Sequence, residues 1–181
     1  FRSEERSVQK IGTTCRGIGP AYVDKYNRCG IRALDLSDII NLKNKVMHRL
    51  DMAICSGELL KSDRKRIESE IEKFIKDSEL ISSMVDDTFI MIHDMVDNNK
   101  NILLEGAQGT MLDINHGTYP YVTSSSPSSG GIATGLGLPL TKVSRIVGIF
   151  KAYTTRVGKG PFPTELFNEF GKKLQDLGNE Y

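Results

Sequence analysis

The residues best suited to chemistry in this 181-residue chain begin with a glycine-rich stretch, IGTTCRGIGP, at residues 11–20. Its glycines let backbone N–H groups converge, Thr13 and Thr14 add hydroxyls, and Arg16 adds a fork of donors, a combination that binds phosphate. A tight surface turn with an incidental arginine explains the same letters. The stretch is not a Walker A loop, because the pattern G-x-x-x-x-G-K-[ST] occurs nowhere in the chain.

A second polar stretch, EGAQGT, follows the apolar run Ile102–Leu104. We expect this run to be a buried strand whose carboxyl end carries a ligand, as in open α/β folds. The Gln108 amide can read a base edge, stabilise a developing oxyanion, or satisfy loop backbone. Thr123 and its neighbouring hydroxyls suit a second phosphate contact, or simply a solvated loop. His116 is a candidate general base, although a lone loop histidine more often has a structural role.

Helices and strands must position these loops. Between residues 37 and 97 glycine and proline are almost absent and apolar residues recur at helical spacing. The spacing predicts three helices, of which the first is broken by Gly57. A second buried strand is expected within residues 143–157, closed by Pro161 and Pro163. The predicted helices span roughly residues 37–56, 59–75 and 80–96, with a further helix beginning within residues 164–177.

Composition and charge exclude several functional classes. The chain has 24 Lys and Arg against 23 Asp and Glu, a net charge of +1, so no clustered basic surface argues for nucleic acid or an anionic membrane. Its apolar runs fall far short of the roughly 20 residues that cross a bilayer. The cysteines, with no C-x-x-C pair, predict neither a disulfide framework nor a zinc site, so a cytoplasmic location is expected. They are Cys15, Cys29 and Cys55.

Five colinear blocks of the sequence resemble the adenylosuccinate synthetases. They read IGTTCRGIGPAYVDK, GIRALDL, EGAQGTMLDINHGTYPYVTSS, GGIATGLGL and KAYTTRVGKGPFPTEL, in that family's order and spacing. The resemblance implies the central part of a P-loop-NTPase-like α/β ligase with a helical insertion subdomain. It divides the chain into a phosphate-binding loop and dimer-contact segment (residues 1–36), a helical subdomain (37–98) and part of the nucleotide-binding core (99–181).

The resemblance also implies a reaction. The family uses GTP and Mg²⁺ to phosphorylate the 6-oxygen of IMP, and the amine of L-aspartate then displaces that phosphate to give adenylosuccinate. The family is homodimeric, with one arginine reaching into the partner's IMP site. By position in the matching blocks, that arginine is Arg28, the 5′-phosphate is bound by Thr14 and Thr123, the 6-oxygen is contacted by Gln108, and Thr13, Arg16 and Gly17 support the phosphate loop.

The sequence departs from the family in two respects. Cys15 stands where the family commonly has glycine or lysine. The family's catalytic Asp and His lie ahead of Phe1, and its aspartate loop and guanine-binding segments lie beyond Tyr181, so we expect an incomplete chain that binds no metal and is inactive alone. The alternative is a non-catalytic IMP-binding or dimerisation fragment, while another kind of phosphotransferase is disfavoured by the missing Walker A loop.

Overall fold

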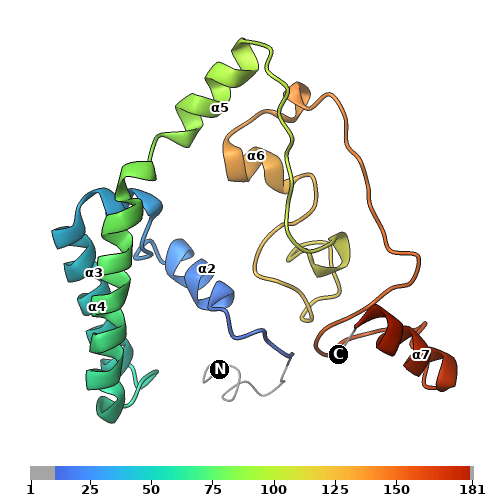
Figure 1. Ribbon diagram of the computed structural model, residues 1–181, viewed down its shortest axis with the longest axis horizontal. Coiled ribbons are helices and arrows are strands. Elements are labelled where there is room, and N and C mark those ends of the chain that lie inside the picture. Colours follow the sequence, from blue (N-terminus) through green and yellow to red (C-terminus); the bar gives the residue numbers. More distant parts are fainter. Residues whose placement is uncertain (1–10, 180–181) are drawn as a thin grey trace. The chain divides into compact units, whose positions relative to one another are not determined.

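The computed structural model describes residues 11–179, and its regular elements within that range are all helical (Figure 1). The described chain divides into a helical unit, residues 17–95, and a loop unit, residues 11–16 and 96–179. None of the described helices is both long and apolar enough to cross a membrane. The α-helices are α2 (Ile18–Tyr26), α3 (Ile39–Cys55), α4 (Arg64–Ile81), α5 (Thr88–Asp97), α6 (Gly131–Leu136) and α7 (Glu169–Gly178), and short 3₁₀ helices occupy Ala33–Ser37, Lys61–Asp63, Ser82–Met84, Thr110–Leu112 and Leu140–Lys142.

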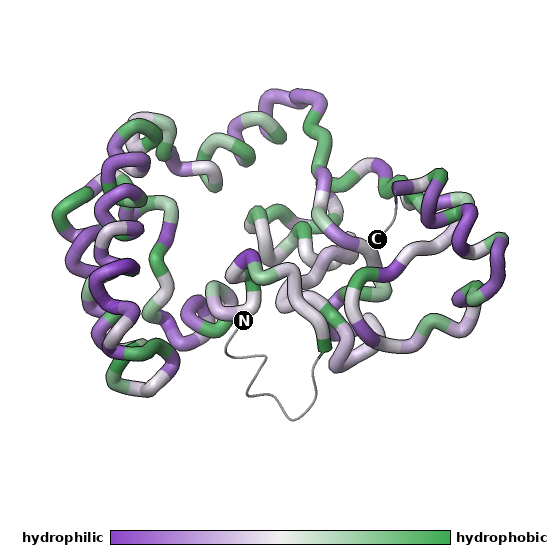
Figure 2. Tube along the Cα trace, turned by 60° about the horizontal axis from the view of Figure 1, so that its bottom comes forward, coloured by the Kyte–Doolittle hydropathy of each residue, from purple (hydrophilic) through white to green (hydrophobic). Residues whose placement is uncertain are grey.

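The core of the helical unit lies between α3 and α4, which run side by side (Figure 1). Leu42 and Leu50 from α3 pack with Ile71 and Ile75 from α4, and Leu42 is completely buried. Each buried side chain of this kind stabilises the fold by about 1.5–3 kcal/mol. Hydrophilic residues alternate with apolar ones along both helices, so each helix has one apolar face (Figure 2).

Local signals define the boundaries of α3. The side chain of Asp38 accepts a hydrogen bond of 3.0 Å from the backbone of Asn41 and so caps the first turn. Gly57, with a φ of 74°, follows the C-terminal end of α3. The predicted break at this glycine is confirmed, because α3 ends at Cys55. The left-handed backbone conformation that often follows a helix suits glycine best.

Two other helix predictions need correction. The third helix was expected from residue 80, but residues 80–81 complete α4 and α5 begins only at Thr88. The cause is Asp87, whose carboxylate accepts hydrogen bonds from the backbone of Phe89 and Ile90 and thereby caps a new helix. The helix α2 begins inside the glycine-rich stretch, at Ile18. Pro20 does not prevent this, because proline is tolerated in the first turn of a helix.

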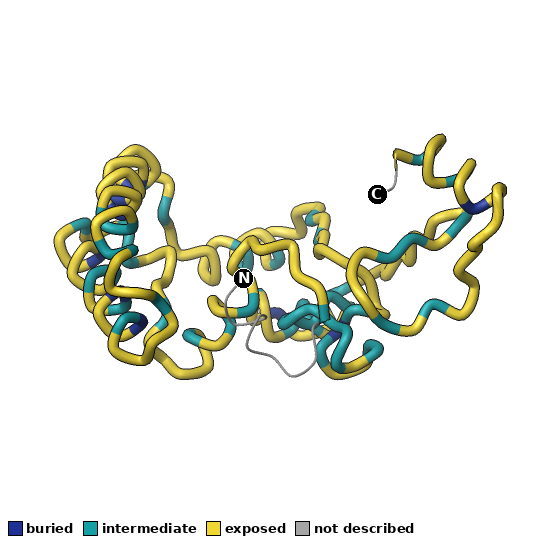
Figure 3. Tube along the Cα trace, turned by 90° about the horizontal axis from the view of Figure 1, so that it is seen from below, coloured by how far each residue is buried: buried dark blue, intermediate teal, exposed yellow. Residues whose placement is uncertain are grey.

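The two predicted strands are not present among the described residues. Ile102–Leu104 and residues 143–150 have no regular secondary structure, and Leu103, Ile149 and Phe150 are 88, 93 and 92% exposed. Figure 3 shows the loop unit's chain exposed along most of this second segment. A strand requires a neighbour that completes its hydrogen-bond ladder, and the described residues supply none. This portion of the fold is therefore helical with long irregular connections, and the expected α/β class does not apply to it.

Candidate functional site

A buried carboxylate organises the loop between the 3₁₀ helix Thr110–Leu112 and α6, the Asp113 loop. Asp113 is fully buried and accepts hydrogen bonds from the backbone of Asn115 (2.9 Å), from the Ser128 hydroxyl (2.8 Å) and backbone (3.3 Å), and from the backbone of His116 (3.3 Å). These donors, the Asn115 N–H foremost and then the Ser128 hydroxyl, lower the pKa of Asp113 from 3.8 to about 2, against the opposing effect of burial. Asp113 is consequently a structural anion at neutral pH.

The same loop folds back on itself and places Thr123. The backbone of Thr123 donates to the Leu112 carbonyl at 2.8 Å, and the backbone of Ile114 donates to the Ser125 carbonyl at 3.0 Å. Thr123 is half-buried beside these contacts. The segment that carries Thr123 is therefore an ordered loop, held by its own backbone hydrogen bonds rather than only solvated.

Gln108 occupies an uncommon backbone conformation just ahead of this loop. Its φ is 64°, and its side chain is exposed. A non-glycine residue in the left-handed region costs on the order of 1–3 kcal/mol, and such residues cluster at ligand sites, where the surrounding structure enforces them. The neighbouring Gly106 lies against the loop as well, since a Cβ there would stand 3.6 Å from the Pro127 carbonyl. The Gln108 side chain is therefore exposed on a segment that lies close to the Asp113 loop through nearby Gly106.

The first glycine-rich stretch packs against a turn far along the sequence. The backbone of Lys159 donates to the Ile11 carbonyl at 3.2 Å. Gly12 (φ 85°) lies so close to Gly158 that a Cβ on Gly12 would stand 2.8 Å from the Gly158 Cα. Only glycine permits this approach. The hydroxyl of Thr13 accepts a hydrogen bond of 3.1 Å from the backbone N–H of Cys15. The side chains of Thr14 and Arg16 are exposed.

Arg156 joins that turn to the Asp113 loop. Its Nε donates to the Lys159 carbonyl and its Nη2 to the Tyr121 carbonyl, both at 3.0 Å, and the guanidinium also reaches the Thr118 hydroxyl at 3.4 Å. The turn at residues 156–160 thus contacts Ile11 on one side and the segment before Thr123 on the other. The structure brings the threonine-bearing segments of the predicted site to a common turn.

Arg28 belongs to the helical unit, whereas the other predicted substrate-binding residues belong to the loop unit. It lies in the turn that follows α2, with a φ of 61° and an exposed side chain. Its backbone donates to the Lys25 carbonyl at 3.1 Å, and the next two residues both donate to the Asp24 carbonyl. The turn is therefore well defined, although the Arg28 side chain is exposed to solvent.

No metal site is formed by the residues that the structure describes. Nowhere in residues 11–179 do three or more His, Cys, Asp or Glu residues gather as they would around a metal ion. The oxygens of Asp113 are engaged by its four hydrogen bonds. The described residues therefore do not fit a Mg²⁺ site.

Two organising residues escaped the interpretation of the sequence. Arg156 was not among the candidate site residues, and its partners are the Lys159 carbonyl, three residues away, and the Tyr121 carbonyl, 35 residues away. Asp113 was not among the candidates either. The pair Asp113 and Asn115 in a glycine-rich loop is nevertheless typical of a turn in which an aspartate side chain binds backbone two residues ahead, and this signal could have identified it.

Comparison with known proteins gives one consistent result. The sequence model of the family described as adenylosuccinate synthetase matches residues 1–181. The chain is 45% identical over 181 residues to the adenylosuccinate synthetase of Pediococcus pentosaceus, covering 99% of this chain and 42% of that protein. It is 50% identical over 176 residues to the enzyme of Streptomyces griseus, covering 95% of this chain and 40% of that protein. The chain thus spans about two fifths of the length of these curated relatives.

A solved structure shares the fold of this portion. The fully ligated adenylosuccinate synthetase from Plasmodium falciparum superimposes with a TM-score of 0.88 and 41% sequence identity. The match covers 96% of this chain and 40% of that one.

Proposed function

The chain belongs to the adenylosuccinate synthetase family, and from that premise we propose that the protein of full family length that contains it (the full-length protein below) joins IMP to L-aspartate with GTP. The γ-phosphoryl group of GTP passes to the 6-oxygen of IMP, leaving GDP, while the base loses the proton from N1. The amine of aspartate then attacks C6, a C–N bond forms, the amine loses a proton, and phosphate leaves with the former 6-oxygen. Phosphorylation thereby makes a poor leaving group into a good one.

The observation that carries this proposal is the meeting of the glycine-rich loop and the Asp113 loop at the turn of residues 156–160. We assign the 5′-phosphate of IMP to the hydroxyls of Thr14 and Thr123, one from each loop. Thr13, Arg16 and Gly17 support the first of these contacts, because a ring of N–H and guanidinium donors complements a dianion. A phosphate contact of this kind serves substrate and transition state equally and so lowers KM.

Gln108 acts on the reacting end of the substrate. Its amide donates to the 6-oxygen of IMP, where negative charge collects as phosphoryl transfer begins. A fixed donor at such a position is worth about 3 kcal/mol in the transition state. The exposed side chain of Gln108 and its left-handed backbone, a conformation that clusters at ligand sites, support this role.

Arg28 completes the site of a second subunit. We propose that the full-length protein is a homodimer and that Arg28 of each protomer reaches the IMP bound by its partner. Its exposed side chain on a defined turn supports that assignment. The planar fork of a guanidinium suits the oxygens of a nucleotide.

GTP and Mg²⁺ are bound by parts of the full-length protein other than residues 11–179. The described residues offer neither a cluster of metal ligands nor a Walker A loop. When bound, Mg²⁺ neutralises the charge that develops on the transferred phosphoryl group. In this arrangement residues 1–36 and 99–181 contribute IMP contacts, residues 37–98 form the helical subdomain, and the enzyme is cytoplasmic.

The test is the formation of adenylosuccinate by the full-length protein supplied with IMP, GTP and aspartate, followed by chromatography. We expect product that depends on all three substrates and none from the 181-residue chain alone. Omitting GTP is the matched control. Binding of IMP without turnover by the full-length protein would instead identify a non-catalytic IMP-binding protein, and neither binding nor turnover would contradict the assignment to IMP.

A further inference from the structure

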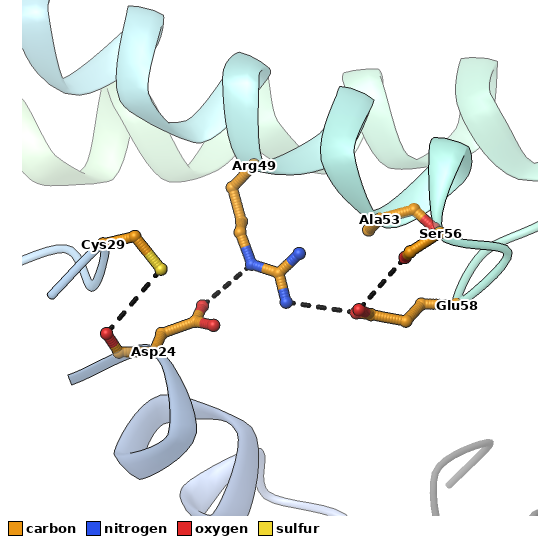
Figure 4. Close-up of polar contacts among 6 residues, drawn as sticks. All are labelled: Asp24, Cys29, Arg49, Ala53, Ser56 and Glu58. Carbon is orange, nitrogen blue, oxygen red and sulfur yellow. Dashed lines mark hydrogen bonds and ion pairs between the residues drawn. The ribbon is translucent and has the colours of Figure 1, made fainter. Parts of the chain in front are cut away.

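Arg49 of α3 holds two carboxylates of the helical unit at once (Figure 4). Its Nε donates to Asp24 Oδ2 at 2.9 Å, and its Nη2 donates to Glu58 Oε2 at 3.1 Å. The Arg49 side chain is 33% exposed and that of Asp24 20%, so this pair is better shielded from water than an ordinary surface ion pair. Glu58 is fixed in turn by the Ser56 hydroxyl, which donates to its other oxygen at 3.1 Å.

Asp24, the residue that Arg49 holds, also organises the turn that carries Arg28. The Asp24 carbonyl accepts hydrogen bonds from the backbone of Cys29 (3.0 Å) and of Gly30 (3.1 Å) and a weak one from the Cys29 thiol (3.7 Å). Gly30 is packed tightly there, because a Cβ on it would stand 3.3 Å from the Asp24 carbonyl carbon. The side chain and the backbone of one residue therefore link α3 to both sides of the Arg28 turn.

Apolar packing does little to hold this turn in place. α2 contains no buried residue. The hydrogen bond from Arg49 to Asp24 therefore contributes much of the attachment of the C-terminal half of α2 to α3. We infer that Arg49 is a positioning residue for Arg28: by holding Asp24, it sets the place and direction from which Arg28 reaches the partner's substrate. This inference rests on the proposed function of Arg28.

The chemistry of arginine is required for this task. The guanidinium spans Asp24 and Glu58 with separate N–H groups of one planar fork, whereas a lysine ammonium is a point charge that cannot span both in that geometry. Removing Arg49 leaves two carboxylates unpaired and lets α2 move relative to α3. The predicted consequence is weaker binding of IMP with the chemical step intact, because Arg49 itself touches no substrate.

Steady-state kinetics of the full-length protein test the inference first. We expect Arg49→Ala to raise the KM for IMP about tenfold, the effect of losing one well-placed charge-assisted contact, with kcat within about twofold of the unaltered enzyme. Arg49→Lys should restore only part of the affinity. Arg66→Ala is the matched control, because Arg66 forms an exposed pair with Glu70 at 2.9 Å on the surface of α4, and it should leave both constants unchanged.

A double-mutant cycle separates positioning from a general structural effect. If Arg49 acts through Arg28, the double variant Arg28→Ala/Arg49→Ala should have the same KM for IMP as Arg28→Ala alone. Additive effects would overturn the inference. Asp24→Asn, which weakens the same link from the other side, should raise KM by a smaller factor and serves if Arg49→Ala fails to yield a folded dimer by circular dichroism and gel filtration.

Mixed dimers give the sharpest signature. Arg49 and Arg28 of one chain serve the partner's site, while Thr14 serves its own, so mixing Arg49→Ala with Thr14→Ala subunits should restore one site of good affinity per hybrid. Mixing Arg49→Ala with Arg28→Ala should restore none, because both sites then lack a well-placed Arg28. Recovery in both mixtures, or in neither, would contradict the inference. If Arg28→Ala leaves the KM for IMP unchanged, the proposed function of Arg28 fails; if only Arg49→Ala does, the inference alone fails.

Discussion

The helical unit and the loop unit of this chain satisfy their side chains in different ways. In the helical unit, α3 and α4 bury a core between helices joined by a short connection. In the loop unit, the large apolar side chains at Leu103, Ile149 and Phe150 are almost fully exposed, while the buried groups include the carboxylate of Asp113. The first unit is held by local apolar packing and the second by polar contacts between distant loops.

This difference shows which unit depends on the rest of the family fold. Apolar runs such as Ile102–Leu104 and residues 146–150 suit strands covered on both faces. The chain spans about two fifths of its relatives, so partners for these segments are expected in the remaining three fifths. The α3–α4 core needs no such partners, although the helical unit also exposes large apolar side chains such as Ile40 and Leu80. Truncating an apolar side chain should therefore have different effects at this core and in the exposed segments of the loop unit.

Truncating one apolar side chain in each unit tests this contrast with the largest effect. In the 181-residue chain, Leu42→Ala should lower the free energy of unfolding by about 3 kcal/mol, because it opens a cavity at a fully buried site. Phe150→Ala should change it by less than about 0.5 kcal/mol, because the side chain is exposed. Urea unfolding followed by circular dichroism at 222 nm measures both.

The same pair in the full-length protein supplies the control. There Phe150→Ala should become destabilising by about 3 kcal/mol, as expected for a buried aromatic residue, while the effect of Leu42→Ala stays the same. An unchanged, small effect of Phe150→Ala in the full-length protein would show that this segment is never covered, and the contrast between the units would lose its explanation.

Within the loop unit, variants of Gln108 and of Thr123 should affect different kinetic constants, kcat for the first and the KM for IMP for the second. Gln108→Ala in the full-length protein should lower kcat by roughly 10²-fold, because a donor to the developing oxyanion is lost, with less change in KM for IMP. Thr123→Ala should raise the KM for IMP and change kcat less, since a contact to the 5′-phosphate stabilises the ground state and the transition state equally. Steady-state kinetics with varied IMP measure both, and an effect of Gln108→Ala on KM alone would refute its role at the 6-oxygen.

The polar character of the loop unit predicts a specific loss in acid. The pKa of Asp113 is about 2 in the fold against an ordinary 3.8, so its stabilising contribution is present above pH 3.8 and is lost as the pH falls towards 2. Amide hydrogen exchange should therefore show the loop of residues 109–131 opening over this pH window.

Asp113→Asn is the matched variant for this measurement. It should be less stable at neutral pH, because one oxygen acceptor becomes a donor facing N–H and O–H donors, and it should lose most of the pH dependence of exchange in this loop. The helical core serves as the internal reference. Opening of the loop over the same window in Asp113→Asn would assign the effect to another carboxylate.

Sequence reasoning succeeded where structure is local and failed where partners are distant. The end of α3 follows from Gly57, since periodicity and a left-handed glycine act over a few residues. The start of α5 was wrong because the capping carboxylate of Asp87 outweighed a continuous apolar pattern. The strand expected at Ile102–Leu104 has the right composition, but a ladder also requires a neighbour, which composition does not supply.

The candidate site shows the same limit. Its residue types and their order along the chain were predictable, but the strand expected ahead of Gln108 is absent from the described residues. The contacts that assemble the loops were not predictable, because Arg156 donates to backbone carbonyls, which residues of every type carry. Only the folded chain reveals which carbonyl a guanidinium meets.

A crystal structure of the full-length protein with IMP tests the assignment of the IMP site. We expect the 5′-phosphate at hydrogen-bonding distance, about 3 Å, from the hydroxyls of Thr14 and Thr123. We also expect the Gln108 amide at the 6-oxygen and Arg28 of the partner subunit at the same nucleotide. Density for IMP away from the loops that meet at residues 156–160, or a phosphate held without either threonine, would contradict it.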